Sequence, residues 1–219
     1  MNVRNINVNL IMFDIDGTLI ESCGFDADCY LKAVKTVTGV ELNTDWTLYT
    51  HITDAGILDE FITMEGLHEN RDALHRQVKE EFTYLVSSHL KASPVREVDG
   101  AVDFLTLLQA RSDVEIALAT GGWEETAKAK LRSAGFDPTD VAFASCSDHV
   151  QRTRVMQTAE SRCRSHAFAT KTYFGDGPWD KTASRELDYQ FILVGNSLQH
   201  SKQVDHFRDP RSVLSLIGI

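Results

Sequence analysis

Two carboxylates stand one residue apart at the point where an apolar segment of the chain ends. The segment Leu10–Phe13 leads directly into Asp14, Ile15 and Asp16, and a glycine and a threonine follow. Such a run is typical of a buried parallel strand, and alternate side chains of an extended chain point the same way. Asp14 and Asp16 can therefore face one centre, where they repel each other unless a cation or a proton lies between them. The spacing predicts a polar site at the carboxyl end of a first strand.

Two later strand ends carry polar groups of a similar kind. One β-prone segment ends in Thr120 and Gly121, and another leads into Asp176 and Asp180. Because the carboxyl ends of parallel strands meet at one edge of a sheet, we expect these groups to lie beside the first pair. A glycine lets a backbone N–H approach an anion closely, and grouped carboxylates offer the oxygen ligands that Mg²⁺ prefers. The alternative is structural, since Thr120 or Asp180 could simply cap the helix that follows it.

The rest of the sequence predicts the elements that hold these groups. Helical periodicity recurs over residues 25–37, 56–64 and 82–90 without a strand pattern between them. An amphipathic helix over 98–108 follows, and after it strands and helices alternate. We expect strands at 10–13, 114–120, 141–144, 172–175 and 190–194, helices at 123–134 and 154–164, a helix ending at Leu187, and a short closing helix around Leu214 and Ile217.

This alternation predicts an α/β fold in which helices cover both faces of a Rossmann-like parallel sheet. We assign residues 1–21 and 94–219 to this core domain, and residues 22–93 to an inserted, all-helical domain.

Composition narrows the classes of partner. The chain has 219 residues and a formal net charge of −10, which argues against nucleic acid or an anionic membrane as the main partner. The four cysteines show no metal-binding spacing, so we expect free thiols in a reducing compartment. No apolar run reaches the roughly 18–20 residues of a membrane span, and no signal-peptide pattern is evident. We therefore expect a soluble, cytoplasmic protein, either a monomer or a dimer.

The motifs together resemble those of the haloacid dehalogenase-like phosphotransferase superfamily. Four apolar residues followed by Asp-x-Asp-Gly-Thr resemble its first motif, Thr120-Gly121 its second, and Asp176 with Asp180 its fourth. The resemblance covers the predicted core, about residues 7–20 and 95–197. The helical block is similar to the cap that the phosphoglycolate phosphatase and β-phosphoglucomutase branch carries at this position.

The resemblance implies a role for each of these residues. Asp14 would be the nucleophile that forms an aspartyl-phosphate, and Asp16 the general acid and base. Asp14, the backbone carbonyl of Asp16, Asp176 and Asp180 would hold Mg²⁺, while Thr120 and Gly121 would bind the substrate phosphate. The second aspartate favours phosphoryl transfer over carbon–halogen cleavage.

The chain departs from the family at the third motif, which is normally a lysine that bridges nucleophile and phosphate. The loop where it would lie holds Arg152 and Arg154 instead. We predict that Arg152 binds the phosphate, because some phosphatase-like branches whose fourth motif resembles Gly-Asp-Gly-x-Trp-Asp, as residues 175–180 do, use an arginine there. A guanidinium is always charged and can bind two phosphate oxygens at once, so it can fill the role. Arg154 is the alternative, and Lys171 or a residue of the cap is a further one.

These features predict a magnesium-dependent phosphatase that acts on a small phosphorylated metabolite. A phosphomutase of the β-phosphoglucomutase type is the nearest alternative. A phosphonate-cleaving enzyme would need a cap lysine such as Lys32 or Lys35, and a binding protein with a decayed site is a more distant possibility. The substrate is not predicted, although residues 50–54 and Gly56 could face the site or simply cap a helix.

Overall fold

A computed structural model describes residues 8–219 of the chain. Its centre is a six-stranded sheet in the order β3-β2-β1-β4-β5-β6, in which every neighbouring pair is parallel. The predicted α/β fold is therefore confirmed, while residues 1–7 of the predicted core lie outside the described part. The strands are β1 (Asn9–Phe13), β2 (Val114–Ala119), β3 (Ala142–Ala144), β4 (Lys171–Gly175), β5 (Gln190–Val194) and β6 (Gln203–Val204).

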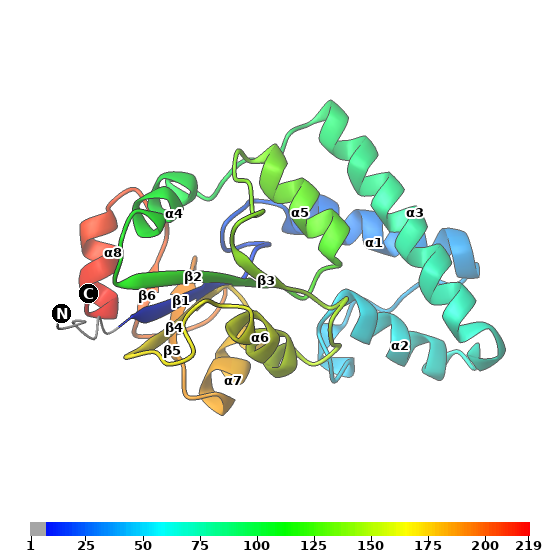
Figure 1. Ribbon diagram of the computed structural model, residues 1–219. Helices are drawn as coiled ribbons and strands as arrows, with labels where there is room; N and C mark the ends of the chain where they lie inside the picture. Colours follow the sequence, from blue (N-terminus) through cyan, green and yellow to red (C-terminus); the bar gives the residue numbers. More distant parts are fainter. Residues whose placement is uncertain (1–7) are drawn as a thin grey trace.

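Helices connect the strands from β1 to β5 and form the insertion between β1 and β2 (Figure 1). The insertion contains α1 (Cys23–Thr38), α2 (Asp54–Met64), α3 (Arg71–Ala92) and the 3₁₀ turns Trp46–Leu48 and His68–Asn70. The remaining helices are α4 (Ala101–Gln109), α5 (Glu124–Ser133), α6 (Arg152–Ser161), α7 (Pro178–Glu186) and α8 (Pro210–Ile217). Within the described residues, no helix is both long and apolar enough to cross a bilayer.

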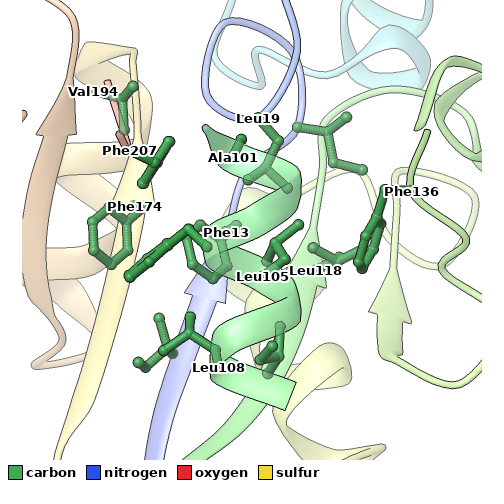
Figure 2. Packing of buried hydrophobic residues seen from close by; sticks show 14 of the residues in the cluster. Phe13, Leu19, Ala101, Leu105, Leu108, Leu118, Phe136, Phe174, Val194 and Phe207 are labelled. Carbon is green, nitrogen blue, oxygen red and sulfur yellow. The ribbon is translucent and has the colours of Figure 1, made fainter. Parts of the chain in front are cut away.

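Strand β1 is buried on both faces, which fixes the position of the loop at its carboxyl end. Ile11 and Phe13 pack in one cluster with α4, α5 and α8, whereas Leu10 and Met12 pack in another with α6 and α7. Phe13 stacks on Phe174 of β4 at 4.9 Å between ring centroids (Figure 2). Each fully buried side chain of this size contributes about 1.5–3 kcal/mol. The middle of the sheet is thus a firm base for the residues that follow β1 and β4.

A third apolar cluster joins the inserted helices to the core. Tyr30 of α1, Phe82 of α3 and Trp123 from the loop before α5 pack together, with Phe82 at 5.5 Å from Trp123 between ring centroids. Helix α3 also lies along α5 (Figure 1). These aromatic side chains thus form one of the contacts between the insertion and the core, and the designation of residues 22–93 as a separate domain stays a prediction.

Several element boundaries differ from those predicted. The helix expected over 98–108 begins at Ala101, because Gly100 has a left-handed φ of 80° and stands at its N-cap. The helix expected over 154–164 is α6, which begins at Arg152. The third inserted helix spans 22 residues, whereas the sequence predicted only residues 82–90 of it. The first half of this helix is mostly polar, so it shows no clear apolar periodicity. Strand β6 was not expected, because two residues carry no period.

Candidate active site

The first and fourth motifs meet at the carboxyl ends of β1 and β4. The backbone N–H of Asp14 donates to the carbonyl of Phe174 at 2.9 Å, which continues the strand pairing past β1. Gly17 then turns the chain with a φ of 78°, and a β-carbon there would lie 2.2 Å from Oδ2 of Asp176. Only glycine allows both the left-handed backbone and this close approach.

Three carboxylates form one acidic cluster at this edge. Asp14, Asp176 and Asp180 each have an oxygen within 4.8 Å of the others. Asp180 is the third residue of α7, and its Oδ2 accepts from the N–H of Gly177 at 3.1 Å. The alternative that Asp180 is the N-cap of a helix beginning at residue 181 is therefore wrong, because α7 begins three residues earlier at Pro178.

The cluster carries more negative charge than its surroundings balance. Burial raises the pKa of Asp14 well above its ordinary value, and Asp180 adds to this effect. Burial and then Asp180 raise the pKa of Asp176 to about 7. Burial also raises the pKa of Asp180, although Arg152 opposes this rise. An all-oxygen set with unbalanced negative charge suits a hard divalent cation, so these residues fit Mg²⁺.

Arg152 is the cation that reaches the acidic cluster. It is the first residue of α6, and its Nη1 lies 2.8 Å from Oδ1 of Asp14 and 3.5 Å from Oδ1 of Asp180. Its side chain is only 11% exposed. A β-carbon on Gly121 would lie 2.7 Å from Nη2, so the glycine of the second motif makes room for the guanidinium.

The two remaining cations that could have filled the third motif lie elsewhere. Arg154 is exposed on α6 and donates to Gln157 at 3.1 Å. Lys171 begins β4, at the opposite end of the strand from the acidic cluster, and pairs with Glu160. Of the three candidates from the sequence, Arg152 is thus the one in contact with Asp14.

Thr120 lies at the end of β2 and faces the same edge. Its buried Oγ1 accepts from the N–H of Gly122 at 3.1 Å, and the N-cap of α5 is Trp123, so Thr120 does not cap that helix. A β-carbon built on Gly122 would lie 3.6 Å from this hydroxyl and 3.7 Å from Oδ2 of both Asp16 and Asp54. A hydroxyl and two carboxylate oxygens therefore surround one small space beside the acidic cluster.

Asp16 belongs to a second buried cluster that the sequence did not reveal. Its Oδ1 accepts from Nζ of Lys130 at 2.5 Å and from the hydroxyl of Ser22. The same ammonium lies 2.6 Å from Oδ1 of Asp26 in α1. Burial lowers the pKa of Lys130, but the two carboxylates raise it more, so the value lies above the ordinary one.

One signal in the sequence could have drawn attention to Lys130. It lies on the same face of α5 as Ala127 and Leu131, three positions before and one position after it, and both are buried. A lysine on the apolar face of a helix is unusual, because a buried ammonium requires partners. The identity of those partners could not be deduced, since they are distant in sequence.

The amino end of α2 meets the core at the second motif. Thr53 caps α2 by accepting from the N–H of Gly56 at 3.1 Å. The N–H of Asp54 donates to the carbonyl of Gly121 at 2.9 Å, and Oδ2 of Asp54 accepts from the N–H of Trp123 at 3.0 Å. The turn before α2 therefore both caps the helix and faces the site.

A cavity of 300 Å³ lies between the acidic cluster and the inserted helices. A wider groove of 570 Å³ adjoins it and shares four of its lining residues, namely Trp46, Ile52, Arg152 and Trp179. On the side of the insertion, the cavity is lined by carboxylates and by apolar or aromatic groups, including Asp26, Tyr30, Trp46, Asp54 and Ile57. Among the described residues that line either hollow, Arg152 is the one lysine or arginine.

Comparisons with known proteins agree with this architecture. The model of the haloacid dehalogenase-like hydrolase family matches residues 8–188. A hydrolase from Pseudomonas syringae is similar with a TM-score of 0.72 and 17% identity over 95% of this chain and 99% of its own. A β-phosphoglucomutase from Clostridium difficile is similar with a TM-score of 0.71 and 13% identity, covering 95% and 96%.

CbbY from Rhodobacter sphaeroides, solved in complex with phosphate, is similar with a TM-score of 0.67 and 16% identity, covering 92% of this chain and 96% of its own. At such identities the solved structures bear on the fold alone. A search of curated proteins found no match.

Proposed function

Because the chain belongs to the haloacid dehalogenase-like hydrolases, we propose that it is a magnesium-dependent phosphatase that hydrolyses a small phosphorylated metabolite through an aspartyl-phosphate. Membership of the family confirms the resemblance that the motifs indicated. The contact of Arg152 with Asp14, at the rim of a cluster of three carboxylates, is the observation that carries the proposal. A guanidinium beside a nucleophilic carboxylate is the arrangement that can bring a phosphate dianion to it.

The proposed reaction has two steps. In the first, a carboxylate oxygen of Asp14 bonds to phosphorus while the bond from phosphorus to the alcohol oxygen breaks, and Asp16 gives that oxygen a proton. In the second, Asp16 takes a proton from water as the water oxygen bonds to phosphorus, and Asp14 leaves. Arg152, the hydroxyl of Thr120 and the N–H of Gly121 would hold the phosphate oxygens during both steps.

Mg²⁺ would neutralise charge on the phosphate when it is held by Asp14, Asp176, Asp180 and the backbone carbonyl of Asp16. The fit rests on the unbalanced negative charge of the three carboxylates, whose pKa values burial raises. The inserted helices would exclude water from the cavity and contact the alcohol part of the substrate.

A panel of phosphorylated metabolites, assayed for phosphate release with and without Mg²⁺, tests this proposal. A phosphatase releases inorganic phosphate from at least one of them. When the phosphate group of that substrate is labelled, enzyme quenched with acid during turnover should carry the label as the aspartyl-phosphate. The β-phosphoglucomutase fold neighbour makes a mutase the second candidate, and a mutase would instead retain the phosphate and yield an isomeric phosphate ester.

Phosphonate cleavage and a decayed binding site are less well supported. Lys32 and Lys35 are both exposed, Lys35 pairs with Glu41, and neither lysine lines the cavity. Neither is therefore placed to form the Schiff base that phosphonate cleavage would need. The grouping of Asp14, Asp176 and Asp180 argues against a decayed site. The cytoplasmic location and the choice between monomer and dimer stay predictions.

A further inference from the structure

Lys130 is a fully buried cation at the junction of the core and the inserted helices. Its side chain is 0% exposed, and its ammonium lies between Asp16, which follows β1, and Asp26 in the first turn of α1. A buried ammonium is retained only where carboxylates and hydrogen bonds compensate for lost water. The position therefore ties the middle of α5 to the loop that carries the proposed general acid.

The two oxygens of Asp16 have different surroundings. Oδ1 accepts from Lys130 at 2.5 Å and also from the hydroxyl of Ser22. Ser22 occupies the N-cap position of α1, yet its hydroxyl accepts from no backbone N–H of the helix and instead donates to Asp16. Two donors on one oxygen fix the rotation of the carboxyl group about its last bond.

The other oxygen faces the site. Oδ2 of Asp16 and Oγ1 of Thr120 lie 3.7 and 3.6 Å from the position that a β-carbon on Gly122 would occupy. Within the hydrogen bonds of residues 8–219, Oδ2 has no donor of its own. It is thus the oxygen of this carboxyl group that is open to a substrate.

We propose that Lys130 is a positioning residue for proton transfer, which holds Asp16 by Oδ1 so that Oδ2 exchanges the proton with substrate and water. This inference rests on the proposed function. In the first step the proton leaves Oδ2 for the alcohol oxygen as its bond to phosphorus breaks. In the second step Oδ2 receives a proton from the water that attacks the phosphoryl group.

Asp26 extends this arrangement to the inserted helices. It accepts from Lys130 at 2.6 Å, so the ammonium is held from the side of α1 as well as from the loop. Without Asp26, the ammonium would keep Asp16 as its remaining carboxylate partner. Asp26→Asn should therefore have a smaller effect on proton transfer than removal of the ammonium itself.

Leaving-group dependence distinguishes positioning from a merely structural role. The leaving group of glycerol 1-phosphate is an alkoxide, whose departure depends strongly on protonation. The departure of phenolate from phenyl phosphate depends on it less, and p-nitrophenyl phosphate releases a phenolate that is stable without a proton. kcat/KM reports the formation of the phosphoenzyme, in which this proton is given. We expect Lys130→Met to lower kcat/KM by about 100-fold on glycerol 1-phosphate and by only about 3-fold on p-nitrophenyl phosphate, within the range for general acid catalysis.

Ser22→Ala supplies a second, milder change to the same oxygen. It should lower kcat/KM for glycerol 1-phosphate by only about 5-fold, because one of the two donors to Oδ1 remains. It should leave kcat/KM for p-nitrophenyl phosphate unchanged. Lys128→Met is the matched control, since Lys128 lies on the same helix and pairs with Glu124. With this variant, kcat/KM for each of the three substrates should stay within about 2-fold of the wild-type value.

The outcomes separate this inference from the proposed function. Equal losses on all three substrates in Lys130→Met and Ser22→Ala would overturn the positioning role while the phosphatase function stands. If Lys130→Met does not fold, Ser22→Ala decides in the same way. If the wild-type enzyme with Mg²⁺ releases phosphate from none of these three esters and from no member of the panel of phosphorylated metabolites, the proposed function fails and the inference fails with it.

Discussion

Two buried clusters in this molecule each place one cation between two carboxylates, and they differ in the charge left over. Arg152 lies between Asp14 and Asp180, with Asp176 as a third carboxylate nearby. Lys130 lies between Asp16 and Asp26 alone. If every carboxylate is ionised, the first cluster has a formal excess of two negative charges and the second a formal excess of one. The first excess suits a divalent metal ion, and the second suits a single proton that is exchanged during the reaction.

The clusters also differ in how the chain builds them. The acidic cluster and Arg152 stand on the ends of β1 and β4 and on the first turns of α6 and α7. The lysine cluster joins a loop, an inserted helix and the middle of α5. A sheet edge holds the groups proposed to bind phosphate and metal in fixed positions, whereas the position of the proposed proton-transfer group depends on how the insertion packs. Changes in the first cluster should therefore have larger effects than changes in the second.

Asp14→Asn should have the largest effect on activity. The amide keeps the size of the side chain but cannot form the phosphoenzyme, so kcat should fall by at least about 10⁴-fold. Phosphate release with p-nitrophenyl phosphate measures the loss, and circular dichroism checks that the variant is folded. A variant that retained a tenth of the wild-type rate would rule out Asp14 as the nucleophile.

Removal of the metal should come next. Chelation with EDTA should lower activity by about 10³-fold, and added Mg²⁺ should restore it, whereas Ca²⁺ should inhibit because it favours more ligands. Mg²⁺ should also raise the melting temperature, since it binds the folded state. Asp176→Asn should abolish that rise and Asp26→Asn should not. Full activity after exhaustive chelation would contradict the metal site.

Arg152→Ala should lower kcat/KM by about 100-fold, in line with loss of one charged contact to the transferred phosphoryl group. Arg152→Lys should recover part of the loss. Arg154→Ala is the matched control, because Arg154 is exposed and lies two residues further along the same helix. Its kcat/KM should stay within about 2-fold of the wild-type value. Exchange of these results between the two arginines would move the third motif to Arg154.

A smaller effect is expected on stability as a function of pH. Burial, followed by the charge of Asp26, raises the pKa of Asp54 to about 8, and burial and Asp180 raise that of Asp176 to about 7. Both groups bind protons more tightly when folded than when unfolded. Their contribution to stability is therefore present below pH 4 and is lost as the pH rises through 7 and 8.

Urea unfolding of the metal-free protein at pH 5 to 8 measures this loss. We expect the free energy of unfolding to fall by roughly 1 kcal/mol per pH unit for each group. Asp54→Asn should make the slope shallower, and Mg²⁺ should remove the part that Asp176 contributes. Stability that stays flat or rises over this range would show that neither carboxyl group titrates as described.

The contrast between the clusters also explains what the sequence could predict. Apolar strands that end in Asp, Thr and Asp motifs were enough to group Asp14, Thr120 and Asp176, because parallel strands bring their carboxyl ends together. The sequence placed Arg152 and Arg154 where the third motif would lie, but the choice between them came from the family resemblance, and the contact of Arg152 with Asp14 is seen only in the structure. Lys130 was not predicted as part of the site, since its partners Asp26 and Asp16 are 104 and 114 residues away. That contact depends on how the inserted helices are placed against α5, which no local sequence pattern records.

Because the cavity and the groove have so few cationic lining residues, they would discriminate between substrates by the charge of the alcohol part. Arg152 is the one lysine or arginine among the described residues that line the cleft, and Asp14 already engages it. A second anionic group on the alcohol would enter beside Asp26 and Asp54 and meet no counter-charge. In competition with p-nitrophenyl phosphate, 2-aminoethyl phosphate should therefore bind about 10-fold more tightly than phosphoglycolate, which is of similar size. Equal inhibition by the two would show that the cleft is indifferent to charge, whereas the expected difference would make it an electrostatic filter against doubly anionic metabolites.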